Sequence, residues 1–505
     1  MAPDGGTAIL VLGDPRLTER CTAVGGAYHG LASDLARLTA ALAEARARLG
    51  FGRAISAPQI GLMRRIIAID LGAGPFALID PEIVWRSDDT LPVWDDCLSV
   101  PDRLVRVRRH RSISVRYLDE RFRAREWPHL PFDLSELVQH EIDHLDGVLM
   151  VDRADGDDAV RPIARRAELV DAARPAHRLS LARIAEAART IDAVFVRSPR
   201  LTSAPLSERA RASLTLKVET VNPIRSFKGR GADYFVGQAV ADGERGPLVC
   251  ASAGNFGQAM AYACGRRGIA LTVFVARSAS PLAVARIRAL GAELVHPGDD
   301  FEAAKACARA WAAERGARFV EDGREPAVSE GAGSIAVELF ARNEAYDDAF
   351  DAVVVPVGDG ALISGIARWV KAASPATRVI GVCSRGAPAV RDAWRRGPGA
   401  PIVAHERADT IADGIAVRAP VAAAVADMIG LVDDIVVVDD AQLLEAMRLV
   451  HAHHGLVVEP SGVAGVAAIL GGRAGALEGK AIATVLTGGN VTREQMQAWR
   501  LLDAA

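Results

Sequence analysis

The chain has 505 residues, of which half are hydrophobic and 24% are charged, so it is long enough for two or three globular domains with sizeable cores. Its 60 basic and 63 acidic residues leave a net charge of only −3, which disfavours nucleic acid or an anionic membrane as a partner. No apolar run approaches the roughly 20 residues of a membrane helix, and the start lacks the pattern of a secretory signal. Six cysteines stand far apart without a CxxC pair, so we expect free thiols in a reducing, cytoplasmic compartment.

The first part of the chain, residues 8–151, is predicted to contain short β-strands and one strong helix near its end. The strand-like runs are residues 65–70, 76–79 and 112–117. A basic stretch over residues 103–125 alternates with Val, Ile and Tyr, which predicts the solvated face of β-strands rather than a binding surface. We expect residues 153–178 to supply a closing helix and then a linker.

The second part of the chain alternates apolar strands with helical segments. The predicted strands are residues 214–218, 247–250, 270–275, 351–355, 378–382 and 481–486. Nearly continuous apolar strands separated by helices are typical of buried parallel strands in a doubly wound α/β fold. We therefore expect a first domain over residues 1–170, a linker over 171–180 and a second domain over 181–505.

A candidate metal site lies in the segment QHEIDH, residues 139–144, which contains the pattern HExxH. On a helix, His140 and His144 are one turn apart on the same face, so both imidazoles can bind one cation. Glu141 stands beside the first of them, where a carboxylate can take a proton from water at the metal. The alternative interpretation of this segment alone is a pair of surface histidines on an amphipathic helix.

Two further segments favour the metal site. Residues 94–101, WDDCLSVP, offer Cys97 as a thiolate ligand, and residues 52–61, GRAISAPQIG, offer the side-chain amide of Gln59 in a loop bounded by glycines. Taken in chain order, residues 52–61, 94–101 and 139–144 resemble the three motifs of peptide deformylases. The resemblance covers roughly residues 8–165.

This resemblance implies a role for each matching residue. The metal ligands would be Cys97, His140 and His144, with Fe²⁺ as the expected metal and Zn²⁺ or Ni²⁺ as alternatives. Glu141 would act as general base and then as acid, while Gln59 and the backbone N–H of Leu98 would stabilise the oxyanion formed at a formyl carbon. The chain departs from the family pattern at Ala54, which replaces a glycine, and at Asp95 and Asp96, which replace Glu and Gly.

A second constellation begins with the segment SFKG, residues 226–229, which follows a predicted strand. Small neighbours would let a bulky ring approach Lys228, although a solvated lysine at a helix start is the alternative. Three turns with glycines then follow other predicted strands: SAGNFG at residues 252–257, VGDGALISG at 357–365 and TGGN at 487–490. Four such segments at the carboxyl ends of parallel strands predict a ligand site for an anionic cofactor.

This order of motifs resembles the tryptophan-synthase-β-like group of pyridoxal-phosphate enzymes, and within it the serine/threonine dehydratases. The segments 330–334, 410–417 and 459–462 add to the likeness, which spans about residues 180–503. The fold class expected for the whole chain is therefore an α+β deformylase-like domain followed by an α/β domain with two open, mostly parallel sheets.

The second resemblance also implies roles. Lys228 would bond to pyridoxal 5'-phosphate and then move the Cα proton, and Thr487 would face the pyridine nitrogen with a neutral hydroxyl, which suits elimination or replacement at the β-carbon. Asn255 would bond the ring oxygen. The phosphate would lie on the backbone of Gly358, Asp359, Gly360, Ala361 and Leu362. The substrate carboxylate would lie on Ser252, Ala253 and Gly254.

The expected function is that of a bifunctional enzyme, which removes an N-formyl group and eliminates ammonia from a hydroxy amino acid such as serine or threonine. Ala253 replaces the serine that racemases of this group carry, which favours a lyase or a synthase. The alternative is a β-replacement synthase whose deformylase-like domain is regulatory or inactive. We expect small amino acids or N-formyl amino acids and peptides as substrates, and a homodimer formed through the second domain.

Overall fold

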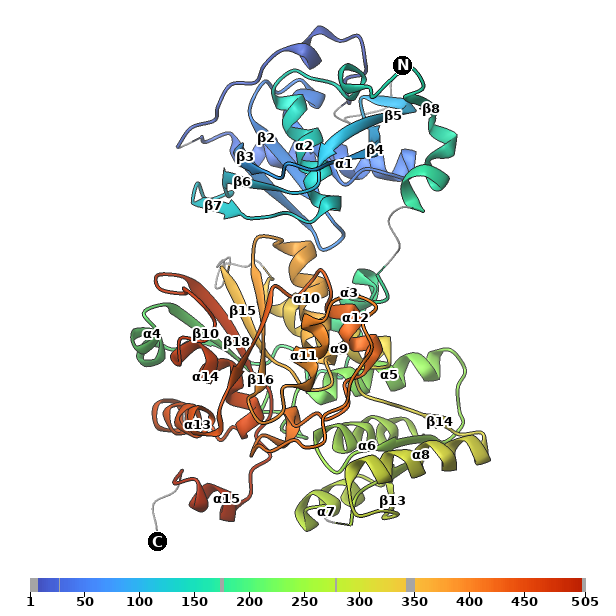
Figure 1. Cartoon of the computed structure of the whole chain (residues 1–505), viewed down its shortest axis with the longest axis vertical. Helices are drawn as coiled ribbons and strands as arrows, with labels where there is room; N and C mark the ends of the chain where they lie inside the picture. Colours follow the sequence, from blue (N-terminus) through green and yellow to red (C-terminus); the bar gives the residue numbers. More distant parts are fainter. Residues whose placement is uncertain (1–7, 27, 173–176, 278, 342–349, 502–505) are drawn as a thin grey trace. The chain divides into compact units, whose positions relative to one another are not determined.

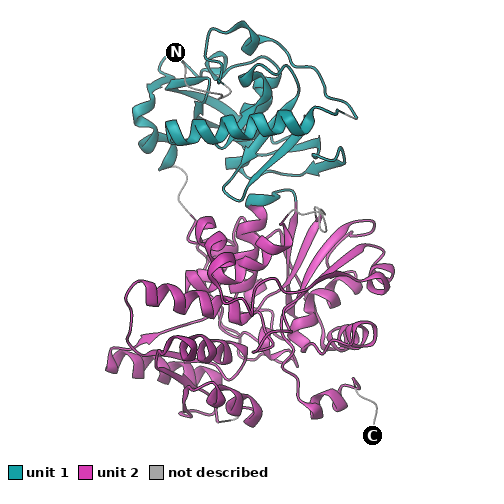
Figure 2. Cartoon of the chain, turned by 180° about the vertical axis from the view of Figure 1, so that it is seen from behind, with its two compact units in different colours: residues 1–176, 372–376 teal, residues 177–371, 377–505 magenta. Residues whose placement is uncertain are grey.

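The structure is a computed structural model, and it describes residues 8–26, 28–172, 177–277, 279–341 and 350–501. The chain divides into two compact units, shown in Figure 2. The first unit comprises residues 1–176 and 372–376, and the second comprises residues 177–371 and 377–505. Within the described part of the chain, no helix has both the length and the apolar character needed to cross a membrane.

The first unit contains two antiparallel sheets. One has five strands in the order β1-β2-β3-β6-β7, and the other has three in the order β4-β5-β8. The strands are β1 Ala54–Ser56, β2 Ile66–Asp70, β3 Pro75–Arg86, β4 Thr90–Cys97, β5 Val100–His110, β6 Ile113–Leu118, β7 Ala124–Trp127 and β8 Val160–Pro162. Each strand-like run predicted for this part overlaps one of these strands.

Two helices accompany these sheets, α1 (Leu31–Leu49) and α2 (Phe132–Leu145). Helix α2 is the strong helix that the sequence predicts, and it packs Val138 and Ile142 into the core formed with β2, β3 and β6. The prediction missed α1, although its buried leucines and alanines recur at helical spacing. The expected closing helix is also wrong, since residues 160–171 form β8 and short helical turns.

The second unit is built on two sheets. The larger sheet has the order β17-β16-β15-β18-β10-β9 and is parallel except for β9; the smaller has the order β13-β12-β11-β14 and is parallel throughout. The strands are β9 Arg200–Thr202, β10 Ser213–Val218, β11 Leu248–Ala251, β12 Leu271–Phe274, β13 Glu293–Val295, β14 Arg318–Phe319, β15 Ala352–Pro356, β16 Arg378–Ser384, β17 Asp434–Val438 and β18 Ala481–Leu486.

Helices alternate with these strands along the chain, as Figure 1 shows. They are α3 Leu181–Thr190, α4 Ala204–Ala210, α5 Lys228–Ala241, α6 Asn255–Arg267, α7 Pro281–Ala289, α8 Phe301–Arg315, α9 Pro326–Leu339, α10 Ala361–Ala373, α11 Ala389–Arg395, α12 Ala422–Met428, α13 Asp440–His454, α14 Ala464–Leu470 and α15 Arg493–Ala498. Four of the connections leave the carboxyl ends of β10, β11, β15 and β18, where parallel sheets bind ligands. These connections carry the motifs that the sequence analysis singled out.

Candidate active sites

The first candidate site is a cluster of Cys97, His140 and His144 in the first unit. The two histidines lie one turn apart on α2, and Cys97 ends β4 at the hairpin to β5. Their ligand atoms all lie within 4.8 Å of one another, and Cys97 Sγ is 3.3 Å from His144 Nε2. All three side chains are buried. Two helix positions one turn apart and a strand end thus bring three ligands together, as the sequence predicts.

The residues of this cluster fit a divalent transition metal. Sulfur and imidazole nitrogen are the ligands that such metals prefer, and three protein ligands leave a coordination position open. Nδ1 of His144 is buried and has no hydrogen-bond partner among the described residues. A cavity adjoins the cluster, and Cys97 and His140 form part of its wall. A metal here would therefore be reachable by a small substrate.

Asp95 and Arg109 orient one of these ligands from behind. Asp95 Oδ2 lies 3.0 Å from Nδ1 of His140, which leaves Nε2 for a metal, and it accepts a hydrogen bond of 2.7 Å from Arg109 Nη2. Burial would raise the pKa of Asp95, but the positive charge of Arg109 and the bond to His140 lower it to about 2. The carboxylate that replaces the family's glutamate thus stays ionised beside the ligand.

Arg109 corrects the prediction made for the basic stretch over residues 103–125. Its side chain is buried instead of facing solvent, because it forms ion pairs with Asp95 and with Asp143 of α2. The alternation of basic and apolar residues along β5 does not predict a buried arginine, because its burial depends on acidic residues that other elements contribute. The HExxH segment could have indicated it, because Asp143 stands between the two histidine ligands.

The Asp95→Asn variant should bind its metal about 10- to 100-fold more weakly, since a neutral amide cannot hold the His140 ring as the carboxylate does. Competition with a chelator of known affinity measures this change in the purified full chain. Asp102→Asn is the matched control, because Asp102 is exposed on β5. An unchanged metal affinity in Asp95→Asn would show that this contact does not orient the ligand.

The predicted catalytic residues Glu141, Gln59 and Leu98 line the same cavity as the metal cluster. The carboxylate of Glu141 accepts a hydrogen bond from Ser56 Oγ, and burial raises the pKa of this carboxyl against the opposing charge of His140. Gln59 Nε2 lies 3.8 Å from Cys97 Sγ. The structure thus brings the proposed acid-base group and the proposed oxyanion donors beside the ligands.

Two ion pairs line the wall of this cavity beyond the ligands. Asp96, which replaces a glycine of the family pattern, pairs with Arg166 at 2.5 Å, and Arg53 pairs with Glu136 at 2.6 Å. Ala54, the other departure, also faces the cavity. The added carboxylate of Asp96 therefore pairs with Arg166 and gives the metal ligands no new partner.

The second candidate site is centred on Lys228, the first residue of α5. Its ammonium group forms an ion pair with Asp322, and Nζ lies 4.7 Å from the centre of the Phe227 ring. The backbone N–H of Phe227 donates a hydrogen bond of 2.9 Å to the carbonyl of Thr487. The lysine segment and the turn after β18 are thus neighbours, although about half of the chain separates them.

Asn255, the first residue of α6, joins two more segments to this site. Its Nδ2 donates to Oε1 of Glu459 at 2.8 Å, and its Oδ1 accepts from Nδ2 of Asn490 at 2.6 Å. Gly488 packs so closely that an added Cβ would lie 2.6 Å from Glu459 Oε1. The segments 252–257, 459–462 and 487–490 therefore converge.

The turn that the sequence predicts as a phosphate site connects β15 to α10. Gly360 has a φ of +99°, and a Cβ on Gly358 would lie 2.5 Å from the carbonyl of Gly414, so both positions favour glycine. Ala361 begins α10 and, with Leu362, is buried. The first N–H groups of a helix of this length are free to bind an anion. A tight backbone turn that opens a helix fits a phosphate group.

A cavity adjoins part of this site, and it is lined by Ser252, Lys305, Asp322 and Asp359 among others. Ser252 Oγ accepts a hydrogen bond of 3.2 Å from the N–H of Gly254, while the predicted neighbour Ala253 carries no polar group. The sequence pattern does not single out Asp322. An acidic residue shortly after a strand could have indicated this position. However, β14 has only two residues, which is too few for a strand to be recognised from its pattern.

Asp359 is the departure from the family's glycine in the phosphate turn. Burial and the negative charge of Asp322 raise the pKa of Asp359 to about 6, while Lys228 and Lys305 oppose this shift. The Asp359 carboxyl lines the cavity beside Asp322.

The Asp359→Asn variant should stabilise the cofactor-free chain above neutral pH. Because the folded-state pKa exceeds the usual 3.8, the folded state binds the extra proton, and stability falls as pH rises from about 4 through 6. The full penalty, about 2 to 3 kcal/mol, should be present at pH 8. Urea unfolding at pH 4.5 and pH 8 measures it. A gain in Asp359→Asn that is equal at both pH values would contradict this account.

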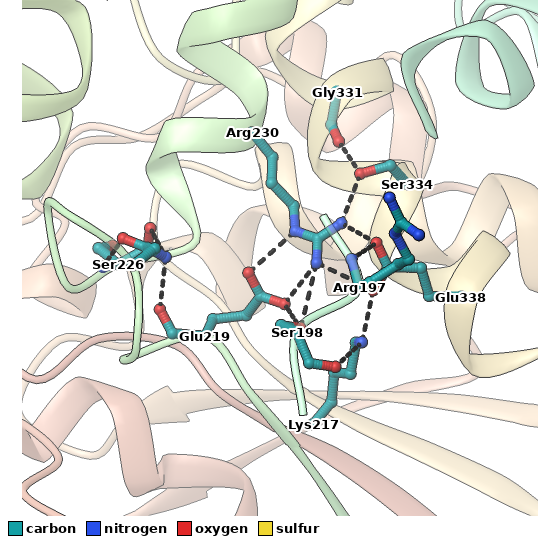
Figure 3. A network of polar contacts seen from close by, with 10 residues as sticks. Arg197, Ser198, Lys217, Glu219, Ser226, Arg230, Gly331, Ser334 and Glu338 are labelled. Atoms are coloured by element: carbon teal, nitrogen blue, oxygen red, sulfur yellow. Dashed lines mark hydrogen bonds and ion pairs between the residues drawn. The ribbon is translucent and has the colours of Figure 1, made fainter. Parts of the chain in front are cut away.

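Arg230 anchors the start of α5 through a buried network, shown in Figure 3. Its guanidinium donates two hydrogen bonds of 2.9 Å to Glu219 and one of 2.6 Å to Glu338. The carbonyl of Glu219 accepts from Asn222, whose amide also binds the carbonyl of Ser226. The network therefore links the end of β10 to the turn that presents Lys228.

The Arg230→Met variant should lower the free energy of unfolding by about 3 to 5 kcal/mol, because it leaves the buried carboxylate of Glu219 and the largely buried carboxylate of Glu338 without their shared cation. Urea unfolding of the full chain measures the loss. Arg245→Met, at an exposed arginine, serves as the control. A loss below about 1 kcal/mol in Arg230→Met would mean that Lys217, which also contacts Glu338, compensates the charge.

Comparisons with known proteins find a match for each of the two parts of the chain. A family model described as pyridoxal-phosphate dependent enzyme matches residues 192–488, and one described as polypeptide deformylase matches residues 7–159. The L-threonine ammonia-lyase of Thermotoga maritima is 34% identical over 313 residues, which cover 62% of this chain and 76% of that protein. The catabolic L-threonine dehydratase TdcB of Escherichia coli K12 is 31% identical over 286 residues, covering 56% of this chain and 85% of its relative.

A solved structure supports the fold of the second unit. The processed form of threonine deaminase isoform 2 from Solanum lycopersicum superposes with a TM-score of 0.58 at 26% identity, covering 64% of this chain and 92% of that one. Parallel sheets with a lysine and glycine turns at their strand ends define an α/β enzyme with an anionic cofactor. The chain belongs to the family of pyridoxal-phosphate dependent enzymes, and its first part matches the polypeptide deformylases.

Proposed function

We propose that the second unit is a pyridoxal-phosphate dependent lyase, which acts on an α-amino acid with a leaving group on its β-carbon. Serine and threonine are the first candidates, because the relatives are threonine ammonia-lyases and dehydratases. The observation that carries the proposal is the convergence of Lys228 with the turns at residues 358–362 and 487–490. Gly323 supports it, since a Cβ there would lie 2.4 Å from the carbonyl of Asp359 and so shows how closely these segments pack.

Each residue of this site has a proposed task. The cofactor, when bound, would supply the electron sink that makes the Cα proton acidic. Lys228 Nζ would carry that proton, and the backbone of residues 358–362 would hold the phosphate. Thr487 would face the pyridine nitrogen with a neutral hydroxyl, and Asn255 would orient the ring. Ser252, Ala253 and Gly254 would hold the substrate carboxylate, and the methyl group of Ala253 favours a lyase over a racemase.

We propose that residues 1–170, which lie in the first unit, form a metal-dependent deformylase. A divalent metal, when bound to Cys97, His140 and His144, would supply a Lewis acid. Glu141 would take a proton from the attacking water and return it to the departing amine. Gln59 Nε2 and the N–H of Leu98 would donate hydrogen bonds to the oxygen that becomes negative. The buried contact between Glu141 and Ser56 would keep the carboxylate in place.

The two activities have a natural order. An N-formyl amino acid cannot react through its amine with the cofactor, because the formyl group blocks that nitrogen. Deformylation in the first unit would therefore precede elimination in the second. The substrate of the first unit would then be an N-formyl amino acid or a short formylated peptide rather than a long nascent chain.

A screen of free and N-formylated amino acids, scored for formate, ammonia and keto acid, tests the proposal. We expect formate from at least one formylated amino acid, and ammonia and keto acid in equal amounts from serine or threonine. Sulfide or another nucleophile can also be added to the assay. If a β-substituted amino acid then forms in place of the keto acid, the second unit is a synthase instead. No formate above the background of Glu141→Ala would overturn the deformylase assignment.

A further inference from the structure

Two ion pairs stand in the wall of the cavity next to the metal cluster of the first unit. One joins Arg53 to Glu136, and the other joins Arg166 to Asp96. These four side chains are largely withdrawn from solvent, since between 5% and 27% of each is exposed. Each guanidinium faces a carboxylate, so the wall they form is strongly polar while the two pairs carry no net charge.

The pair of Arg53 and Glu136 lies about one helical turn from a metal ligand. Glu136 precedes the ligand His140 by four residues on α2, so both side chains lie on the same face of the helix, about 6 Å apart along its axis. Arg53 is fixed beside Glu136, because its Nη1 also donates a hydrogen bond of 2.8 Å to the carbonyl of Asp133. An amino acid with its formyl group at the ligand cluster would therefore bring its β-carbon near this pair.

Both pairs have hydrogen-bonding atoms to spare. Arg166 donates through Nε to Asp96 Oδ2 and through Nη1 to Asp171 Oδ1, whereas its Nη2 has no hydrogen-bond partner among the described residues. Within the same part of the chain, Nε of Arg53 and Oδ1 of Asp96 also have none. A hydroxyl group both donates and accepts, so it can bond to a guanidinium and to a carboxylate of this wall.

A substrate side chain that packs against this wall displaces the water that solvates the ion pairs. An apolar side chain offers no hydrogen bond in return, so the pairs lose solvation without compensation. A charged side chain meets an opposite and a like charge in each pair, and these two effects largely cancel. A short neutral side chain with a hydroxyl group therefore suits the wall best.

We propose that these two ion pairs select an N-formyl amino acid, or a short formylated peptide, whose first residue carries a hydroxyl group on its β-carbon. This selection rests on the proposed deformylase function, and its substrates would be N-formylserine and N-formylthreonine. Water adds to the formyl carbon, the bond from that carbon to nitrogen breaks, and formate and a free amine form, so atoms balance without an oxidant or a reductant. The product would be serine or threonine, the first candidates for the second unit.

Formate release by the full chain supplied with a divalent metal tests this proposal on two compounds of nearly the same shape. N-formyl-L-threonine carries a hydroxyl group where N-formyl-L-valine carries a methyl group. We expect kcat/KM to be at least about tenfold higher for the threonine compound, whereas an apolar pocket would use the valine compound equally well or better. N-formyl-L-aspartate, as a charged probe, should also be used less well than N-formyl-L-threonine.

Removal of a whole ion pair changes the wall without leaving a buried charge unpaired. The double variant Arg53→Met and Glu136→Met should lose the preference for threonine, which is a change of about tenfold or more. The matched control is the double variant Asp89→Met and Arg111→Met, which removes an exposed ion pair from the same unit and should keep the preference. Full preference for threonine in the first double variant would overturn the inference.

Asp96→Gly tests the second pair independently. This variant restores the family's glycine and leaves Arg166 bonded to Asp171, so its fold should survive. The preference for threonine over valine should fall by about threefold or more, because the wall loses a carboxylate that can accept from the hydroxyl group. If the double variant at Arg53 and Glu136 does not fold, an unchanged preference in Asp96→Gly overturns the inference by itself.

Binding provides a readout that does not depend on turnover. Isothermal titration calorimetry on the full-length Glu141→Ala chain should show that N-formyl-L-threonine binds at least about tenfold more tightly than N-formyl-L-valine. Equal binding of the two compounds, or none, together with equal use of both by the natural chain, would overturn the inference and leave the deformylase assignment intact. A preference for N-formyl-L-aspartate over N-formyl-L-threonine would also overturn it, because the arginines would then recognise a carboxylate.

The same measurements separate this inference from the proposed function. If no formylated compound yields formate, the deformylase assignment fails, while the calorimetric comparison still decides whether the wall selects a hydroxyl group.

Discussion

A chain in which Lys228 is replaced by alanine should form keto acid from amino acids at least about a thousandfold more slowly than the natural chain. Lys228 is the residue expected to bond to the cofactor and to move the Cα proton, so its loss removes two functions at once. Its fold should survive, because the buried anchor of α5 is Arg230 rather than Lys228. Coupled assay of keto acid, together with urea unfolding, measures both effects.

The matched control for this substitution is Lys480→Ala, which removes an exposed lysine from the same unit. That variant should keep its lyase activity. The Lys228→Ala chain should still release formate, since its first unit is unchanged. Keto acid formation within tenfold of the natural rate in Lys228→Ala would show that another group carries the Cα proton, and the assignment of the site would be wrong.

The Glu141→Ala variant should release formate about a hundred- to ten-thousandfold more slowly, the usual range for the loss of a general acid-base group. Its metal content should not change, because Cys97, His140 and His144 supply the ligands. Formate measured by a coupled dehydrogenase and metal measured by elemental analysis distinguish a lost proton carrier from a lost metal.

Glu82→Ala, at an exposed glutamate of β3, is the control for a removed carboxylate in the first unit. Its formate release should equal that of the natural chain. If Glu141→Ala loses its metal together with its activity, Glu141 would be part of the metal site instead of the proton carrier. Retention of full activity would remove Glu141 from the mechanism.

The pattern of the sequence predicts the parts of the fold that depend on local periodicity. The apolar strands at residues 378–382 and 481–486 are β16 and β18, and the HExxH segment lies on a helix. The ligand cluster could also be predicted, because two of its members share one helical turn and the third stands in a matching motif. The sequence pattern does not predict α1, because alanines and arginines make up much of this helix and its apolar stripe is weaker than that of α2.

Partners contributed by distant segments could not be predicted in the same way. Arg109 looks like a solvated strand residue until Asp95 and Asp143 are seen around it. Asp322 follows a strand of two residues, too short to give a periodic signal, and its ion pair with Lys228 joins positions 94 residues apart. Such contacts depend on how sheets and helices pack, which the spacing along the chain does not record.

The metal and cofactor content of one preparation of the full chain tests the central claim most directly. We expect about one divalent metal and about one pyridoxal phosphate per chain, with Cys97→Ser losing only the metal and Lys228→Ala losing only the covalently held cofactor. Less than about a tenth of an equivalent of either group, in protein supplied with both, would contradict the account.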